Sequence, residues 1–307
     1  MPILPGCDDP GMTLLVVVNR SAGTADDEAL DTALDVLRGG TDVEVAATAD
    51  AGELDRVLAG LDGRRPVVAG GDGSLHAAVA ALDRAGALDR PLGVLPLGTG
   101  NDLARALGLP LDPAEAAAVV LGGAARPLDL LRDDAGGIVV NAVHAGVGAD
   151  AGERAHRLKD TLGAVAYPLG AAVAGVTTPG WRLRVEVDGA AVTDGGTPVL
   201  MAGVCNGPTI GGGTALAPDA RPDDGLADVV VVTATGPAAR AAFAAALATG
   251  RHAGRDDVVV VRGREVSLSG EPVGLDADGE LQDPVTARTW RVQPAAWSVL
   301  VPSAPGR

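Results

Sequence analysis

The N-terminal part of the chain consists of short apolar runs, each followed by a glycine turn and a stretch with helical periodicity. The clearest examples are Pro66–Ala69 and Leu92–Leu95, which each lead into a glycine-rich turn. Apolar positions then recur at helical spacing over Leu75–Asp83 and Leu103–Leu107. Strand, turn and helix thus occur twice in succession, which is the repeating unit of a parallel sheet. Ligands of such sheets bind at the carboxyl ends of the strands, where both turns lie.

The same pattern continues on either side of this stretch. Strands are predicted at Leu14–Val18 and Val43–Ala47, and a helix follows the first of them to about Leu37. Another short helix is predicted at Pro113–Leu121, and Gly122-Gly123 ends it. We therefore predict an N-terminal doubly wound α/β domain over residues 1–123.

Residues 124–295 show a different sequence pattern, in which short stretches of alternating apolar and polar residues are separated by turns. Asp188-Gly189 between two alternating runs predicts a hairpin turn. We predict a C-terminal antiparallel β-sandwich domain with two inserted helices, followed by a strand at Ala296–Val301. The predicted strands are Arg126–Leu131, Gly137–Val143, Trp181–Val187, Ala191–Val192, Val199–Asn206 and Ala227–Val232, and the predicted helices are Leu162–Val176 and Pro237–Leu247.

Composition narrows the class of protein. The 307 residues suffice for two domains, and with 47% hydrophobic but only 2% aromatic residues the core must consist of Val, Leu and Ala. A net charge of −16 argues against general nucleic-acid binding and against electrostatic docking on anionic lipid. Cys7 and Cys205 form no disulfide framework, and neither a signal peptide nor a spanning helix is visible. We therefore expect a cytoplasmic protein.

The two glycine turns carry specific chemistry. They are Gly70-Gly71-Asp72-Gly73-Ser74 and Gly98-Thr99-Gly100-Asn101-Asp102. Glycine lets backbone N–H groups approach a ligand closely, and helix N-termini favour anions, so a phosphate fits. Asp72 and Asp102 would repel a bare phosphate, so the turns predict phosphate together with a divalent cation. Alternatively, Asp72 only forms its turn, and Asp102 closes a capping box on Thr99.

Three motifs together resemble the catalytic family of diacylglycerol kinases, with its sphingosine kinase and bacterial lipid kinase relatives. GGDGS is followed by PLGTGNDLAR, and a second block runs from Asn206 to Asp228 as NGPTIGGGTALAPDARPDDGLAD. Asp278-Gly279-Glu280 matches a third motif, so the resemblance spans roughly Thr13 to Pro302. It implies that the first domain is a nucleotide-binding domain similar to those of NAD kinases and phosphofructokinases. It also implies that ATP binds in a cleft between two domains and that strand 296–302 returns to the first.

The resemblance also implies a set of nucleotide contacts. Besides the two turns, Asn19, Gly23 and Thr48 match positions near the nucleotide. The chain departs from the family at Arg20, Ala22 and Ala77, where relatives carry other residues. As alternatives, Asn19 and Gly23 merely form a strand-to-helix turn, and Thr48 or Asp50 caps a helix. The implied contacts are Asn19, Gly23, Thr48, Gly70, Gly71, Asp72, Gly73, Ser74, Gly98, Thr99, Asn101 and Asp102.

Magnesium is the metal that the resemblance implies, at two places. Asp72 and Asp102 would meet the Mg²⁺ that accompanies ATP, and Asp129 matches a further acidic position of the family. A structural Mg²⁺ would be held by Asp224 with the backbone carbonyls of Arg221 and Leu226, which are hard oxygen ligands. Alternatively, Asp224 lies in a solvated turn and Asp129 faces solvent from a strand.

The catalytic residues implied by the resemblance are Asp278, Asp72 and Glu280. Asp278 would be the general base, and Glu280 would bind metal or position substrate. A hairpin turn alone would also explain the sequence Asp276-Ala277-Asp278-Gly279.

We therefore predict an ATP-dependent lipid kinase that converts diacylglycerol into phosphatidic acid at a membrane surface, which it visits transiently. No nucleic acid partner is expected, and a homodimer is compatible with the sequence. Leu162–Val176 is similar to the family's segment beside the acceptor cleft, or it is an ordinary core helix. The alternatives are a kinase for another lipid or soluble alcohol (a sphingoid base, phosphatidylglycerol or a polyol), then an NAD kinase, then a non-catalytic nucleotide- or lipid-binding module.

Overall fold

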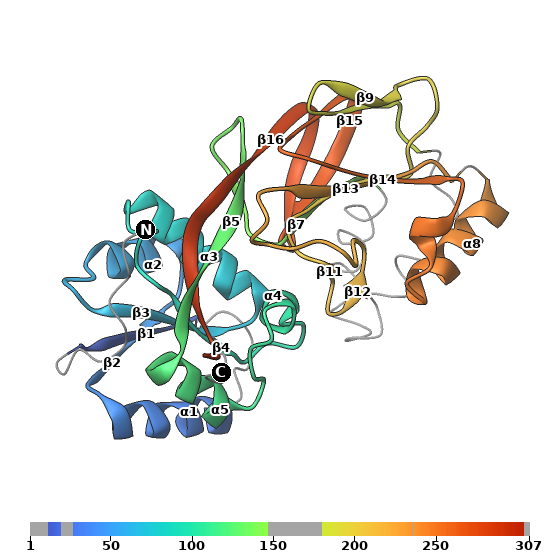
Figure 1. Cartoon of the computed structure of the whole chain (residues 1–307). Helices are drawn as coiled ribbons and strands as arrows, with labels where there is room; N and C mark the ends of the chain where they lie inside the picture. The colour runs from blue at the N-terminus through green and yellow to red at the C-terminus, as the bar shows by residue number, and fades with distance from the viewer. Residues whose placement is uncertain (1–11, 20–26, 147–179, 235, 304–307) are drawn as a thin grey trace. The chain divides into compact units, whose positions relative to one another are not determined.

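The computed structural model describes residues 12–19, 27–146, 180–234 and 236–303 (Figure 1). The chain divides into two compact units, Met1–Leu128 with Ala295–Arg307 (unit 1) and Asp129–Pro294 (unit 2). The predicted helix at Leu162–Val176 and the predicted contact Gly23 lie outside the described residues.

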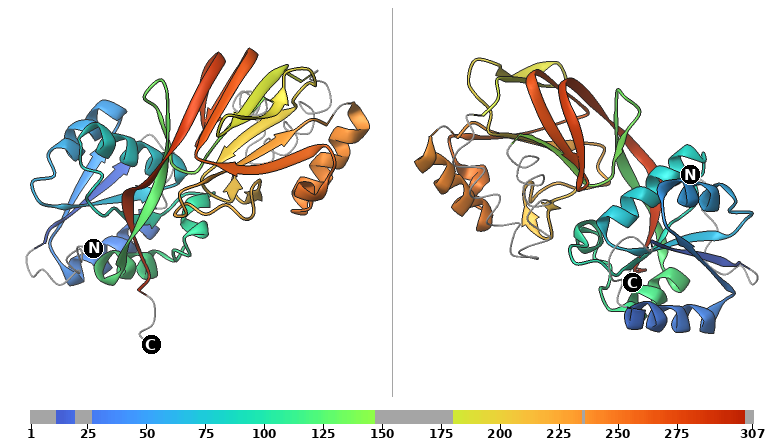
Figure 2. Two further views of the ribbon diagram at one scale, coloured as in Figure 1. Left: turned by 45° about the horizontal axis from the view of Figure 1, so that its top comes forward. Right: turned by 180° about the vertical axis from the view of Figure 1, so that it is seen from behind.

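Unit 1 is built on a parallel sheet. Among its described residues the sheet has four strands in the order β2-β1-β3-β4, and every pair is parallel, which confirms the predicted α/β class. Helices α1 and α5 pack together on one face, while α2 and α3 pack together on the other (Figures 1 and 2). The elements are β1 (Leu14–Asn19), α1 (Asp27–Gly40), β2 (Val43–Thr48), α2 (Ala51–Ala59), β3 (Arg65–Gly70), α3 (Asp72–Arg84), β4 (Gly93–Pro96), α4 (Asp102–Ala106) and α5 (Pro113–Gly122).

The sequence explains these elements locally. Strand β1 reads LLVVVN and is buried almost throughout, as expected for a strand covered on both faces. Asp112 caps α5 by accepting from the N–H groups of Ala114 and Glu115 at 3.0 Å, and Pro113 follows at the first helical position. The last strand of the chain joins this unit, because Val299 pairs in parallel with Leu92.

The four strands of unit 1 end at the same edge of the sheet, because they are parallel. Strand β1 ends at Asn19 and β2 at Thr48, and these two residues are register partners. Strand β3 ends at Gly70 and β4 at Pro96, which are also register partners. The sequence motifs that follow the strands are therefore brought to one edge.

Unit 2 is organised around an antiparallel sheet, which confirms the predicted class. In the described part of the chain ten strands take part, in the order β14-β13-β10-β7-β15-β16-β5-β6, and β8 pairs with both β15 and β9. The strands are β5 (Ala124–Asp133), β6 (Ile138–Val139), β7 (Ala142–Gly146), β8 (Leu183–Val187), β9 (Ala190–Asp194), β10 (Met201–Cys205), β13 (Ala227–Val232), β14 (Val258–Gly263), β15 (Glu265–Ala277) and β16 (Glu280–Val301). A separate ladder joins β11 (Thr209–Ile210) and β12 (Thr214–Ala215), and the described residues of the unit also form helix α8 (Pro237–Ala248) and a 3₁₀ turn (His252–Gly254).

Both faces of this sheet are covered. Along β13, Val229 and Val231 belong to one buried apolar cluster, whereas Val230 and Val232 belong to another. Phe243 of α8 packs in the second cluster. None of the helices that the structure describes is long and apolar enough to cross a membrane.

Several elements differ from the prediction. The single strand expected at Gly137–Val143 is divided into β6 and β7, because the N–H groups of Val140 and Asn141 bind the Asp278 carboxylate instead of a neighbouring strand. Helix α3 begins at Asp72 rather than Leu75. Strand β14 and most of the long β15–β16 hairpin were not predicted.

Candidate functional site

The two glycine turns of unit 1 touch each other through their backbones. A Cβ on Gly98 would lie 2.4 Å from the Cα of Gly71, and a Cβ on Gly71 would lie 3.1 Å from the Cα of Gly98. The N–H of Leu97 also donates to the carbonyl of Gly70 at 3.0 Å. Only glycine allows this approach, so the paired turns form one continuous backbone surface.

Asn101 shapes the second turn from within. Its backbone has a φ of +52°, in the left-handed region that asparagine tolerates. Its side-chain amide donates to the carbonyls of Pro96 at 3.1 Å and Gly98 at 2.7 Å, and its Oδ1 accepts from the N–H of Gly98 at 3.1 Å. Asn101 therefore positions the turn, and its side chain is directed at the backbone.

The structure contradicts the capping-box alternative for this turn. Helix α4 begins at Asp102 with Asn101 as its N-cap, and Thr99 is exposed. A capping box would need Thr99 at the N-cap position, so Asp102 does not close one.

Asp72 links the two turns. Its Oδ1 accepts from the N–H of Leu103 at 3.3 Å, so the residue that opens α3 also lies at the N-terminus of α4. Burial raises the pKa of Asp72, and the charge of Asp102 raises it further. Hydrogen bonds from the N–H groups of Asp102, Leu103 and Asn101 lower this pKa, but the net shift is upward. Asp72 is thus a carboxylate whose ionised form is costly in the folded state.

Other predicted residues surround these turns. Asp102 is only 3% exposed. Ser74 is buried against the first turn, because a Cβ on Gly70 would meet its Oγ at 2.5 Å. Gly73 has open space where a side chain would begin. The first turn therefore combines one tightly packed hydroxyl with one open backbone position.

The neighbouring strand ends carry Asn19 and Thr48. Asp50 is the N-cap of α2 and accepts from the N–H of Glu53 at 2.8 Å, so the capping role belongs to Asp50 and not to Thr48. Thr48 is buried opposite Asn19 in the β1–β2 register. The predicted nucleotide contacts that the structure describes thus all lie in unit 1, at the carboxyl ends of its strands and the turns that follow them.

The residues of this edge fit a magnesium ion that arrives with a nucleotide. Asp72 and Asp102 supply carboxylate oxygens, which are the ligands that Mg²⁺ prefers. Their charges oppose each other, since Asp102 raises the pKa of Asp72. A bound cation would relieve this repulsion.

The residues at Asp224 do not fit the structural magnesium ion that the resemblance implied. Asp224 Oδ1 accepts from the N–H of Leu226 at 3.1 Å, and its Oδ2 pairs with the guanidinium of Arg262. Both oxygens of the Asp224 carboxylate therefore have protein donors as partners, and one of these donors already carries a positive charge.

Asp129 acts on the same turn from another strand. It is 2% exposed, so the alternative of a solvent-facing strand residue is wrong. Its Oδ2 accepts from the N–H of Gly225 at 2.6 Å, and its own N–H donates to the carbonyl of Pro222 at 2.7 Å. Asp129 thus holds the backbone of the Asp223-Asp224-Gly225 turn.

Asp278 forms hydrogen bonds with the backbone of three consecutive residues. Its Oδ2 accepts from the N–H of Val140 at 2.7 Å, and its Oδ1 accepts from Asn141 and Ala142 at 2.9 Å. Its own N–H donates to the carbonyl of Ala142 at 2.9 Å. Three of the roughly four acceptor positions of this carboxylate are thus taken by backbone N–H groups, so Asp278 anchors the backbone of residues 140–142. Glu280 is exposed at the start of β16.

Two asparagines that sequence reasoning did not single out complete this polar region of unit 2. Asn206 donates to the carbonyls of Asp129 at 3.1 Å and Val140 at 2.8 Å. The N–H groups of Asn206 and Gly207 donate to the carbonyl of Asn141 at 2.8 Å. A Cβ on Gly207 would lie 2.1 Å from Asn141 Oδ1, which explains why glycine follows Asn206. In the sequence, the pair Asn206-Gly207 was the feature that could have pointed to this contact.

The fold and these motifs define a two-domain kinase class, and comparison with known proteins identifies the family. Residues 13–132 match the diacylglycerol kinase catalytic domain, and residues 141–301 match the YegS C-terminal NAD kinase beta sandwich-like domain. The chain therefore belongs to the YegS-like lipid kinase family.

Individual relatives agree with this assignment. A protein of Xanthomonas campestris pv. campestris (strain 8004), described as a probable lipid kinase, YegS-like, is 36% identical over 291 residues, which cover 88% of this chain and 90% of that protein. A protein of Stenotrophomonas maltophilia (strain K279a) with the same description is 34% identical over 302 residues, covering 91% and 92%. A crystal structure of a diacylglycerol kinase from Bacillus anthracis str. Sterne shares the fold, with a TM-score of 0.76, 23% identity and coverage of 94% and 96%.

The contact between the turns predicts that Gly98→Ala destabilises the protein. Its methyl group would lie 2.4 Å from the Gly71 backbone, so we expect the free energy of unfolding to fall by about 1–3 kcal/mol. Gly73→Ala is the matched control, because its methyl group meets nothing within 4 Å and alanine favours the helix. Chemical denaturation measures both; equal midpoints for Gly98→Ala and the wild type would contradict the contact.

The raised pKa of Asp72 predicts that Asp72→Asn stabilises the folded state at pH 7. Because the folded-state pKa lies above the unfolded value, the ionised side chain costs stability above the folded pKa, and this cost disappears as the pH falls through it. Thermal melting from neutral to acidic pH should show the gain of Asp72→Asn shrinking on acidification. Asp35→Asn, on the exposed face of α1, is the control. A variant less stable than the wild type at neutral pH would refute the argument.

The three bonds to Asp278 predict a structural effect of Asp278→Asn. The carboxamide places an N–H₂ group where a backbone N–H now donates, so we expect a loss of about 1–3 kcal/mol in unfolding free energy. Hydrogen exchange at Val140, Asn141 and Ala142 should become faster. Glu280→Gln on the same hairpin should leave the exchange rates unchanged. Unaltered exchange in Asp278→Asn would show that the carboxylate does not hold this backbone.

Proposed function

We propose that this member of the lipid kinase family uses ATP to phosphorylate diacylglycerol, and that the product is phosphatidic acid. The observation that carries the proposal is the backbone contact of the two glycine turns, with Asp72 joined to both. This arrangement presents backbone N–H groups and the N-terminus of the 13-residue helix α3 beside two carboxylates. It suits the phosphates of a nucleotide together with a cation.

In this proposal the turns hold the phosphates of ATP. Backbone N–H groups of the turns and the N-terminus of α3 bind phosphate oxygens, and the hydroxyl of Thr99 is exposed for the same purpose. Asp102 would hold Mg²⁺, which when bound would offset the negative charge on the phosphates. Precise placement of the γ-phosphate supplies most of the catalysis in phosphoryl transfer.

The proton of the acceptor hydroxyl passes to Asp72 in this proposal. The hydroxyl oxygen forms a bond to the γ-phosphorus, the bond between that phosphorus and the β–γ bridging oxygen breaks, and ADP leaves. Asp72 lies where the two turns meet, at the N-termini of α3 and α4, so its carboxylate is close to the phosphate that the turns would hold. Asp278 instead positions the β6–β7 backbone of unit 2 through its three amide bonds.

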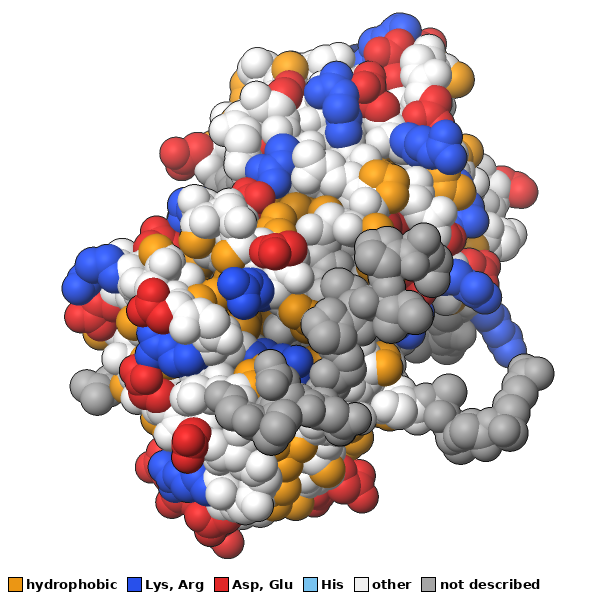
Figure 3. Space-filling model, turned by 60° about the vertical axis from the view of Figure 1, so that its left-hand side comes forward, with side chains coloured by type: hydrophobic (Ala, Val, Ile, Leu, Met, Phe, Trp, Pro, Cys, Tyr) orange, Lys and Arg blue, Asp and Glu red, His pale blue; other side chains and the backbone are white. Residues whose placement is uncertain are grey.

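The charge of the protein favours a neutral lipid acceptor. Acidic residues exceed basic ones by 16, so anionic lipids such as phosphatidylglycerol are repelled. Charged side chains of both signs are interspersed over the face that Figure 3 shows, without one broad basic patch. Diacylglycerol carries no charge and avoids this repulsion.

The decisive experiment is transfer of radiolabelled γ-phosphate from ATP to a panel of acceptors: diacylglycerol, a sphingoid base, phosphatidylglycerol, glycerol and NAD. We expect label in the diacylglycerol product, and a chelator should abolish it. Asp72→Asn should lower turnover about a hundred- to ten-thousand-fold while ATP binding, measured by calorimetry, persists.

Each other outcome of the assay selects a different function. Label in NADP would support an NAD kinase, label in another alcohol would change the acceptor, and no label at all would support a binding module. Asp35→Asn serves as the variant expected to retain wild-type turnover. Wild-type turnover in Asp72→Asn together with loss in Asp278→Asn would return the role of base to Asp278.

A further inference from the structure

One arginine of unit 2 bridges two aspartates that come from different segments. Arg262 on β14 lies opposite Asp228 on β13, and its Nε donates to Asp228 Oδ2 at 3.1 Å. Its Nη2 pairs with Asp224 Oδ2, in the turn before β13. Two different nitrogens of one guanidinium thus bind two carboxylates, a geometry that a planar fork of donors allows.

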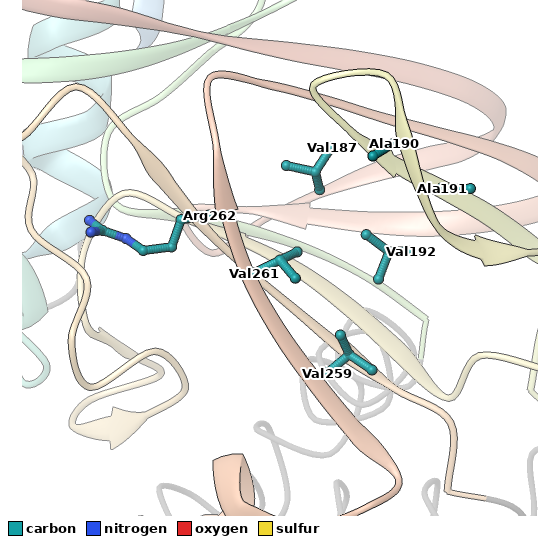
Figure 4. Close-up of a pocket in the computed structure, with 7 residues that line it drawn as sticks. All are labelled: Val187, Ala190, Ala191, Val192, Val259, Val261 and Arg262. Carbon is teal, nitrogen blue, oxygen red and sulfur yellow. The ribbon is translucent and has the colours of Figure 1, made fainter.

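The carboxylates around Arg262 need a positive charge beside them. Asp228 is 3% exposed, and burial raises its pKa; Arg262 opposes this shift, whereas Asp224 and Asp219 add to it. Arg262 borders a pocket together with Val259 and Val261, and Figure 4 shows that its guanidinium extends away from these two valines. Hydrogen bonding to Asp224 in turn raises the pKa of Arg262, which therefore stays charged.

Two backbone N–H groups of the turn are also paired with protein carboxylates. Asp129 accepts from the N–H of Gly225, whose φ of +77° suits glycine. Asp224 Oδ1 accepts from the N–H of Leu226. Protein groups therefore close the turn on both sides of Asp224, and its remaining oxygen faces Arg262.

We propose that Arg262 is the permanent cation of this turn and takes the place of the structural magnesium ion expected at Asp224. The stability of unit 2 then does not depend on a divalent cation at this turn. This inference is independent of the proposed function, because it concerns the folding of unit 2 and not phosphoryl transfer.

The test is thermal melting of the full chain without nucleotide, in excess MgCl₂ or in a chelator. Any Mg²⁺-dependent rise in the melting temperature of the wild type should persist unchanged in Asp224→Asn, because Asp224 binds no metal. Arg262→Gln should melt at least roughly 4 °C below the wild type in both media, since it leaves Asp228 buried without its cation. The melting temperature of Arg262→Lys should lie between those of the wild type and Arg262→Gln, because one ammonium group cannot reproduce the bidentate bridge.

The matched control is Arg291→Gln. Arg291 Nε pairs with Glu265 at 2.7 Å on the same sheet, but both side chains are about half exposed, so the melting temperature should change little. A Mg²⁺-dependent rise that occurs in the wild type and disappears in Asp224→Asn would overturn the proposal. Wild-type melting of both Arg262 variants would overturn it as well. If Arg262→Gln does not fold, the comparison of the wild type with Asp224→Asn and with Arg262→Lys decides.

Discussion

Carboxylates that accept hydrogen bonds from the backbone of distant segments hold loops of both units in place. Asp72 binds the N–H of Leu103, 31 residues away, and joins the two glycine turns of unit 1. In unit 2, Asp129 binds Gly225 across 96 residues, and Asp278 binds Val140 across 138 residues. Each contact satisfies a turn amide that no strand or helix ladder could reach.

A charged acceptor suits this task for a physical reason. Hydrogen bonds to an ionised group are roughly twice as strong as those between neutral groups, and one carboxylate can accept several of them. Asp278 accepts three, from consecutive N–H groups of the chain. The cost of burying the charge is offset only while the acceptor geometry is kept, so these contacts fix the loops closely.

This property also explains where the sequence was informative and where it was not. The parallel sheet followed from local signals, because each strand, turn and helix is contained in a short window of sequence. Within the site, the contact of the turns at Gly71 and Gly98 agrees with their shared place at the ends of neighbouring strands. Asp72 and Asp102 were correctly grouped for the same reason.

The aspartates of unit 2 could not be interpreted in this way. An aspartate in a turn is compatible with a metal ligand, a base or a backbone anchor, and the choice depends on which group faces it. For Asp129 and Asp278 that group is an amide about 100 residues or more away along the chain, and for Asp224 it is Arg262. Strand β14, which carries Arg262, was itself not predicted, so the pairing of Arg262 with Asp228 on β13 could not be anticipated.

The two acidic regions of the protein solve one electrostatic problem in different ways. Burial raises the pKa of both Asp72 and Asp228, so each needs a positive charge nearby in order to remain ionised at low cost. Asp228 has Arg262, which is covalently part of the chain and is always present. The charge that acts on Asp72 among the described residues is that of Asp102, which is of the same sign. A permanent cation suits a region that only has to stay folded. The region of Asp72 is proposed to bind and release a phosphate ligand, and a cation that arrives and leaves with that ligand suits such a region better.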